Sequence, residues 1–452
     1  MPIQCRVEGP RAAWATCSCR KRPAPRVHPT RMFHHRIAPL LLAATFCSAQ
    51  NANVPISCEL SNNTSASPRY GGGKANAAPS NVSKLPIRSL LYEGSSTRIF
   101  TRYMPWFGDA KHRDVGYRSD DREQIRRQVA DMVSRGIQGA IVDWYGSNSG
   151  AKNESTFLLM KEAEQQNFEF AVSEDAGALG DCEKHGCNVT DQLIHDLKYA
   201  AERFENSPAY LRFNKRPAVF SFGLEKYPID WKRVRQSLPL TPLFFFRNSG
   251  SFANDDADGA YSWIAPETVS STDPMALQYL ERFYSKAQQS NKIAIGSAFK
   301  GFDDADASWG KGRVIDQRCG QTWLSTLELA GRFYSASHQL PALIIPTWND
   351  YEEGTEIETG IDNCAEVKAS IRGGDTLVWN ISGRENTIDH IVVLQQQSSG
   401  WSEVRKFATA QHSVTLQDLH VSAETANLCV VTVGKPSMLN HSSGPITVQN
   451  QK

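Results

Sequence analysis

Residues 139–173 read GAIVDWYGSNSGAKNESTFLLMKEAEQQNFEFAVS, and this stretch holds a complete strand–helix–strand unit. Gly139–Trp144 and Glu169–Ser173 are short runs rich in β-branched and aromatic residues, which is typical of strands. Ser155–Gln166, between them, has the pattern of an amphipathic helix. Because a helix usually supplies the crossover between two parallel strands, the stretch predicts a β-α-β unit.

The same alternation continues over residues 91–362. Six further strands are predicted at Ile99–Trp106, Pro217–Phe222, Pro242–Phe246, Gly259–Ile264, Lys292–Ala298 and Ala342–Trp348. Helices are predicted at Asp120–Arg135, Thr190–Asn206, Asp230–Ser237, Asp273–Ser290 and Gln321–His338, with none between Phe246 and Gly259. This rhythm predicts an α/β fold, a (β/α)₈ TIM-type barrel. A doubly wound sheet would need a glycine-rich phosphate turn after its first strand, and Met104–Gly108 (MPWFG) is not one.

After Cys364 the pattern changes to short strands without helices. The predicted strands are Glu366–Ile371, Thr376–Ile381, His390–Gln395, Glu403–Phe407, Ser413–Leu416, Asn427–Val433 and Ile446–Gln449. Such closely spaced strands predict a β-sandwich of immunoglobulin or fibronectin type over residues 363–452. This domain either binds carbohydrate or stabilises the barrel, and we expect the structural role.

The N-terminal part does not resemble a folded domain. Residues 1–50 contain a short basic segment after Met32 and the apolar run Ile37–Phe46 (IAPLLLAATF), followed by small residues. This predicts a secretory signal with translation starting at Met32, and no membrane span in the mature chain. Residues 51–90 are rich in Asn, Ser, Gly and Pro and predict a linker. We expect a secreted or periplasmic protein.

The composition argues against a nucleic-acid binder, because 49 basic residues face 48 acidic ones for a formal net charge of +1. Beyond residue 50, six cysteines remain, an even number compatible with disulfides in an exported protein. Cys182 and Cys187 flank a short loop and are the first expected pair. Zinc is not expected, since only His185 lies nearby. No metal and no nucleotide or redox cofactor is predicted, and the oligomeric state is left open.

In a barrel of this type, functional side chains come from the C-terminal ends of the strands. The strand ends carry both acids and aromatic residues, which together suit the binding of sugars. The acids and aromatic residues at these ends are Tyr103, Trp106, Asp143, Trp144, Tyr145, Glu174, Asp175, Trp263, Trp348, Asp350, Glu352 and Glu353. Arg247, Asn248, Lys300 and Asn349 stand at the same ends. Arg247 and Lys300 either pair with carboxylates or bind an anionic substituent.

Two carboxyl groups with different protonation states can hydrolyse a glycosidic bond, one as acid and the other as base or nucleophile. Asp350 and Glu353 lie three residues apart just after the last predicted strand, where Gly354 permits a turn. Their proximity would raise one pKa and leave an acid beside a base. Two alternatives are a solvated acidic loop and a calcium-binding cluster.

The segment Pro346–Glu358 (PTWNDYEEGTEIE) resembles the motif that closes the barrel of glycoside hydrolase family ninety-nine, the endo-acting α-mannosidases and α-mannanases. It is also similar to a segment of family seventy-one α-1,3-glucanases. Arg102–Gly108 and Gly136–Tyr145 resemble the first two strands of family ninety-nine. By position, the resemblance implies that Glu353 is the general acid and then base. It places Asp350 where a family glutamate assists attack by the substrate's own 2-hydroxyl.

The leading hypothesis is therefore an exported, endo-acting glycoside hydrolase of α-mannan or α-glucan, with Asp350 and Glu353 as catalytic residues. The residues expected to bind or orient the sugar are Tyr103, Trp106, Asp143, Trp144, Tyr145, Glu174, Arg247, Trp263, Lys300, Trp348, Asn349 and Glu352. The alternative is a carbohydrate-binding protein on a hydrolase scaffold, without turnover. His112 and His185 are expected at the surface.

Overall fold

The computed structural model describes Cys58 and residues 81–421 and 425–449. The predicted signal segment and most of the predicted linker, all but Cys58 and residues 81–90, lie outside these residues. Among the described residues, no helix has both the length and the apolar character to span a bilayer.

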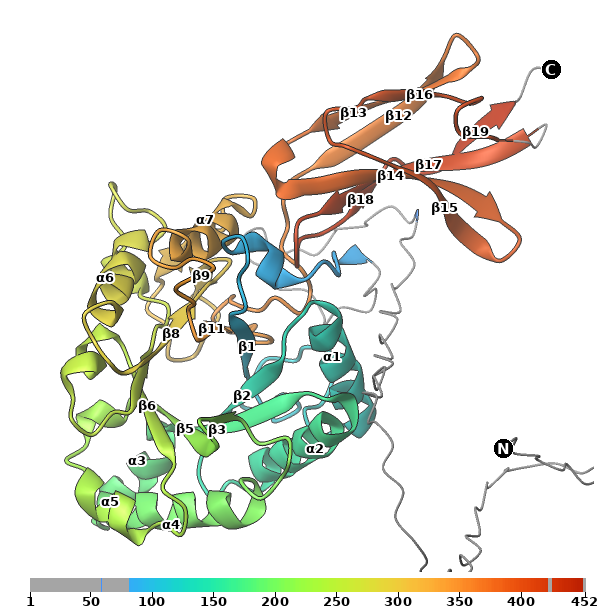
Figure 1. Ribbon diagram of the computed structural model, residues 1–452. Helices are drawn as coiled ribbons and strands as arrows, with labels where there is room; N and C mark the ends of the chain where they lie inside the picture. Colours follow the sequence, from blue (N-terminus) through green and yellow to red (C-terminus); the bar gives the residue numbers. More distant parts are fainter. Residues whose placement is uncertain (1–57, 59–80, 422–424, 450–452) are drawn as a thin grey trace, which may run out of the picture. The chain divides into compact units, whose positions relative to one another are not determined.

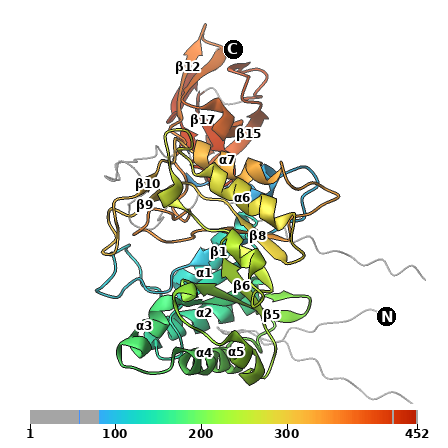
Figure 2. The same cartoon turned by 90° about the vertical axis from the view of Figure 1, so that its left-hand side faces the viewer.

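Eight parallel strands form a closed barrel with helices around its outside (Figures 1 and 2). The strands are β1 (Arg98–Tyr103), β2 (Gly139–Trp144), β3 (Glu169–Asp175), β5 (Arg216–Phe222), β6 (Leu243–Arg247), β7 (Gly259–Tyr261), β8 (Ile293–Ser297) and β11 (Ala342–Ile345). Each pairs with the next around the ring, β3 pairs directly with β5, and β11 pairs with β1 to close it. The predicted (β/α)₈ barrel is confirmed.

The helices of this ring cover the strands with apolar stripes. They are α1 (Arg122–Ser134), α2 (Gly150–Gln166), α3 (Ala176–Lys184), α4 (Val189–Arg203), α5 (Trp231–Ser237), α6 (Leu277–Ala287) and α7 (Gln321–Ala330). In α1, Asp121 caps the N-terminus by accepting from two backbone N–H groups, and Ile125, Val129 and Met132 are buried at helical spacing. Helix α3 was not predicted, and between β6 and β7 there is only the 3₁₀ turn Ser249–Ala253.

Two short hairpins interrupt the barrel pattern. β4 (Arg212–Phe213) pairs antiparallel with β5, and β9 (Phe302–Asp303) pairs antiparallel with β10 (Val314–Ile315). The second hairpin lies in the long connection between β8 and α7, on the side of the barrel where the strands end.

The C-terminal part is a β-sandwich, as predicted. One sheet has β12 (Glu366–Arg372), β13 (Thr376–Ser382) and β16 (Ser413–Thr415). The other has β14 (Ile388–Gln397), β15 (Gly400–Phe407), β17 (Thr425–Gly434), β18 (His441–Ser442) and β19 (Ile446–Gln449). Apolar residues of both sheets, among them Leu377, Trp379, Val393 and Leu428, pack in one core.

Six cysteines form three disulfides in the described residues. Cys182 is bonded to Cys187, the pair that the spacing suggested. Cys58 is bonded to Cys429, and Cys319 to Cys364. The last bond ties the segment before α7 to the segment before β12. Disulfides of this number are typical of proteins in an oxidising environment.

Candidate active site

The segment after β11 folds back on itself and holds two acids in a tight turn. The hydroxyl of Thr347 accepts from the backbone N–H of Asp350 at 2.8 Å, and the Asp350 carbonyl accepts from Thr355 N–H at 3.1 Å. The Asp350 side chain then closes the turn, because its Oδ1 accepts from the N–H groups of Glu352 and Glu353 at 3.0 and 2.9 Å. One carboxylate oxygen of Asp350 is thus anchored.

Asp350 and Glu353 interact electrostatically. Asp350 is buried, and burial together with the neighbouring Glu353 raises its pKa well above the ordinary value. Burial also raises the pKa of Glu353, against the opposing effects of the Trp309 N–H, 3.2 Å from its Oε1, and of Arg313. Two close acids in a poorly solvated place hold one proton between them more easily than none, so the pair can supply an acid and a base together.

Below this pair, charged groups from β1 and β2 meet inside the barrel. The guanidinium of Arg102 forms a buried ion pair with Asp143 and lies over the rings of Phe222 and Trp263, 5.0 and 5.4 Å from their centroids. Asp143 is among the groups that raise the pKa of Glu353. Asp175, at the end of β3, has its pKa raised to about 7 by burial and by the charge of Asp143.

Aromatic rings stand beside the acids. The ring of His112 stacks on Trp106, with centroids 4.9 Å apart and planes 17° apart. Tyr145 meets the other side of Trp106 edge-on at 6.0 Å, and Trp309 meets His112 edge-on at 6.4 Å. Burial and the nearby Asp143 raise the pKa of Tyr145, so its hydroxyl stays protonated and can donate.

Glu352 and Asn349 hold the loop that follows β1. The Glu352 carboxylate is buried and lies 3.0 Å from His112 Nδ1, and it accepts from the backbone N–H of Arg113 at 3.1 Å. Asn349 accepts from Met104 N–H at 2.8 Å and donates to its carbonyl at 3.0 Å. Both side chains, which were expected to bind or orient the sugar, instead make their hydrogen bonds within the protein. His112 is half-buried, not a surface residue.

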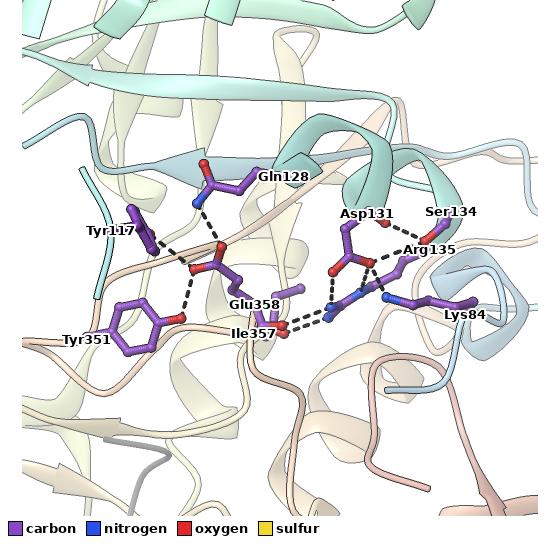
Figure 3. A network of polar contacts seen from close by, with 9 residues as sticks. All are labelled: Lys84, Tyr117, Gln128, Asp131, Ser134, Arg135, Tyr351, Ile357 and Glu358. Carbon is purple, nitrogen blue, oxygen red and sulfur yellow. Dashed lines mark hydrogen bonds and ion pairs between the residues drawn. The ribbon is translucent and has the colours of Figure 1, made fainter. Parts of the chain in front are cut away.

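A second set of polar contacts joins the end of the segment 346–358 to helix α1 (Figure 3). The Glu358 carboxylate accepts from Gln128 Nε2 and the Tyr351 hydroxyl, each at 2.7 Å, and from the Tyr117 hydroxyl at 3.1 Å. Arg135 donates to the Glu358 carbonyl at 2.9 Å. The segment is thus held at both ends and has little freedom to move the acids.

The same Arg135 is fixed by a buried cluster of charges (Figure 3). Its Nε and Nη2 donate to the two carboxylate oxygens of Asp131 at 3.0 and 2.7 Å, and Lys84 pairs with that carboxylate as well. Its Nη1 donates to the Ile357 carbonyl at 2.6 Å. This bidentate pair orients the guanidinium toward the backbone of the segment 346–358.

Glu358 is expected to make stability depend on pH. Burial raises its pKa to about 7, against an ordinary value of 4.5. A raised carboxyl pKa favours the folded state fully below the ordinary value, and this contribution is lost as the pH rises through about 7. The free energy of unfolding is therefore expected to be on the order of 3 kcal/mol lower at pH 8 than at pH 4.5 on account of this group.

Urea denaturation of the native protein and of Glu358→Gln across this pH range measures the effect. The Glu358→Gln variant is expected to lose much of the dependence, because glutamine does not ionise. Glu123→Gln, at an exposed position on α1, is the matched control and is expected to keep it. Identical pH profiles for the native protein and Glu358→Gln would show that Glu358 does not titrate as described.

Several residues expected at the site are instead packed between strands and helices. The ring of Trp144 is fully buried against Tyr199 and Phe204, and its Nε1 donates to Asn153 at 2.6 Å. Tyr103 donates its hydroxyl to Gln128 on α1 at 3.0 Å. Neighbouring residues of a strand point to opposite faces of the sheet. The Asp143 side chain therefore points into the barrel, and the Trp144 side chain points outward, toward the helices. Tyr103 and Trp144, which were expected to bind or orient the sugar, are therefore packing residues of the barrel wall.

Trp348, Glu174 and Lys300 also lie outside the site. Trp348 is fully buried, with the guanidinium of Arg135 4.9 Å from its ring centroid. Glu174 is in register with Trp144 and therefore faces the helices. Lys300 forms a buried ion pair with Glu356, 2.9 Å apart, which is one of the two roles considered for it.

Trp263 and Arg247 lie on the barrel side of their strands, at the end where the site is. Trp263 packs edge-on against Phe222 at 5.2 Å. Arg247 lies 4.5 Å over the same ring and pairs with Glu225 at 2.6 Å. Together with Trp106, Asp143, Tyr145, Asp350 and Glu353, they are the predicted residues that the structure brings to this end.

Two residues of this arrangement, Trp309 and Arg102, were not predicted from the sequence. Trp309 lies in a polar segment far from any predicted strand end, so nothing local marked it. Arg102 could have been found, because it alternates with Tyr103 on β1 and must face the other side. Among the described residues, no group of three or more His, Cys, Asp or Glu side chains is arranged to hold a metal ion.

Comparisons with known proteins give structural neighbours only. No protein-family model matches the chain, and no curated protein is similar to it. A solved GH99 endo-alpha-mannosidase from Bacteroides thetaiotaomicron is 18% identical, with a TM-score of 0.48, over 58% of this chain and 87% of that one. A glycoside hydrolase-like protein is 13% identical with a TM-score of 0.46, over 58% and 87%. An endo-beta-1,4-mannanase from Thermotoga petrophila is 9% identical with a TM-score of 0.32, over 80% and 99%.

Proposed function

We propose that this protein is an exported glycoside hydrolase that cleaves α-linked polysaccharide, α-mannan or α-glucan, from within the chain. The observation that carries the proposal is the adjacent pair of acids, Asp350 and Glu353, held by one turn at the end of the last barrel strand. The raised pKa values of both groups favour the protonated form that an acid catalyst needs. The three disulfides support export.

The proposed chemistry divides the work between the two carboxyl groups. Glu353, the less buried of the two, donates its proton to the glycosidic oxygen as the bond to the anomeric carbon breaks. It then removes a proton from the water that replaces the departed sugar. Asp350 removes the proton of the substrate's 2-hydroxyl as that oxygen attacks the anomeric carbon, and it returns the proton when water opens the anhydro sugar so formed. Its anchored oxygen keeps the other oxygen oriented toward the sugar. This division follows the resemblance of Pro346–Glu358 to the family motif.

The remaining groups fit supporting roles in this scheme. Burial raises the pKa of Asp143, and the ion pair with Arg102 opposes that effect. The charge of Asp143 in turn raises the pKa of Glu353 and helps to keep a proton on it. Tyr145 is half-buried and offers part of its ring to a sugar. Trp106 and Trp263 are buried and support the site by packing, Trp106 against His112 and Trp263 against Arg102 and Phe222. Tyr145 can also donate a hydrogen bond to a sugar hydroxyl.

A reducing-sugar assay of the native protein on α-mannans and α-glucans tests the proposal. New reducing ends, appearing as a ladder of oligosaccharides, are expected on one of these polymers. Tight binding to a polymer without any release would favour the alternative, a carbohydrate-binding protein on a hydrolase scaffold. Neither binding nor release on the whole panel would remove the proposed function.

A further inference from the structure

Trp309 is a large aromatic side chain that is exposed to solvent next to Glu353. It lies in the β9–β10 connection, and 45% of its surface is exposed, whereas the other tryptophans of the described residues are buried or half-buried. Its indole N–H donates to Glu353 Oε1 at 3.2 Å. One side chain therefore offers both an open ring face and a hydrogen bond to the proposed acid.

The connection that carries Trp309 is built to hold its position. The backbone N–H of Asp303 donates to the Glu353 carbonyl at 2.9 Å. Arg313 donates from its backbone N–H and its Nε to the Asp304 carboxylate at 2.7 and 2.8 Å. A side chain at Gly310 would bring its Cβ to 1.7 Å from the Asp304 carbonyl oxygen, so the turn closes tightly next to Trp309.

Trp309 also extends a row of rings. His112 meets Trp309 edge-on at 6.4 Å and stacks on Trp106 at 4.9 Å. The Glu352 carboxylate fixes the His112 ring from the other side. Trp106 and His112 lie in the connection after β1, and Trp309 lies in the connection after β8. Together the three side chains form a row of rings that begins next to Glu353.

We propose that Trp309 is the stacking residue for the sugar on the leaving-group side of the scissile bond, and that its indole N–H also positions the Glu353 carboxyl. This inference rests on the proposed function and deepens it. An acid that protonates the departing oxygen, and later deprotonates the water replacing it, faces the leaving-group side. A ring held against that carboxyl lies next to the departing sugar. Because the Trp309 N–H donates to Oε1 of Glu353, the proton of the Glu353 carboxyl group is on the other oxygen, Oε2.

Two substrates with different leaving groups distinguish a loss of stacking from a general loss of activity in a Trp309 variant. The first is an α-linked oligosaccharide cleaved by the native protein, and the second is the glycosyl fluoride of the same sugar, whose small leaving group occupies no sugar subsite. Trp309→Ala is expected to lower kcat/KM on the oligosaccharide about 10- to 100-fold, and at least about tenfold more than on the fluoride. Equal losses on both substrates would overturn the stacking role.

Trp309→Phe separates the ring from the N–H. Phenylalanine keeps a stacking face but does not donate to Glu353, so the carboxylate loses a stabilising hydrogen bond and its pKa rises. The alkaline limb of the pH–rate profile is expected to move up by about half to one pH unit. The charged groups that also act on Glu353 are Asp350, Asp304, Asp143 and Arg313. An unmoved alkaline limb would overturn the positioning role.

Trp401→Phe, on β15 of the sandwich, is the matched control and is expected to change neither readout. The native protein separates the two proposals. If it cleaves no α-glycan, the proposed function fails. If the native protein cleaves an α-glycan and Trp309→Ala has the native kcat/KM on the oligosaccharide, only the inference about Trp309 fails.

Discussion

Replacing Glu353 by glutamine is expected to lower kcat/KM for α-polysaccharide cleavage by about a thousandfold. Glutamine has the size of glutamate and keeps an oxygen that can accept from Trp309 Nε1, so the local structure should survive. It cannot donate a carboxyl proton to the glycosidic oxygen, nor remove one from water. The rate of reducing-end release by purified Glu353→Gln measures the loss.

Two controls make the result specific. The thermal unfolding midpoint of Glu353→Gln shows whether the fold is intact, and it is expected to stay at or above the native value because a buried charge is removed. Glu123→Gln, at an exposed position on α1, is expected to cleave as the native protein does. A Glu353→Gln variant that folds and keeps the native rate would refute the assignment.

Replacing Arg102 by methionine is expected to lower the free energy of unfolding by about 3–5 kcal/mol. Arg102 and Asp143 form a buried ion pair inside the barrel, and methionine leaves the Asp143 carboxylate without its cation. An uncompensated buried charge is among the most costly defects in a core. Urea denaturation at neutral pH measures the loss.

The double variant Arg102→Met/Asp143→Asn is the internal control. Asparagine carries no charge, so the double variant is expected to regain part of the lost stability. The Arg102→Met defect should also shrink as the pH falls, because Asp143 can then take up a proton. A decrease in the free energy of unfolding of less than about 1 kcal/mol that does not change with pH would show that the Arg102–Asp143 ion pair does not stabilise the barrel.

Much of the fold could be predicted from local patterns. The runs Gly139–Trp144 and Glu169–Ser173 coincide with β2 and β3 within two residues. Each of the eight barrel strands is apolar enough, and most of the helices are long enough, to be recognised without their neighbours. The two-residue strands β4, β9, β10 and β18 were not predicted. Helix α3 is a further exception, because AGALGDCEK is short and contains two glycines, which disfavour helix. It forms because Asp175 caps it and the barrel packs against it.

The site was predictable only in part. Asp350 and Glu353 could be found because they follow a strand end directly and sit in a recognisable motif. Tyr103 and Trp144 stand at strand ends but pack against the helices, since a strand end predicts a position along the barrel axis and not which face the side chain takes. Trp309 reaches Glu353 from 44 residues away through a hairpin whose closure no local pattern signals. The Cys58–Cys429 bond spans 371 residues and could not follow from spacing.

The central claim is that the carboxyl groups of Asp350 and Glu353 act together on one bond. The most direct test compares kcat/KM of Asp350→Asn, Glu353→Gln and the double variant on the polymer that the native protein cleaves. If the two acids work as a unit, each single variant loses most of the activity, and the double variant is less than about tenfold slower than the worse single variant. Losses that multiply, or a single variant with native activity, would contradict the claim.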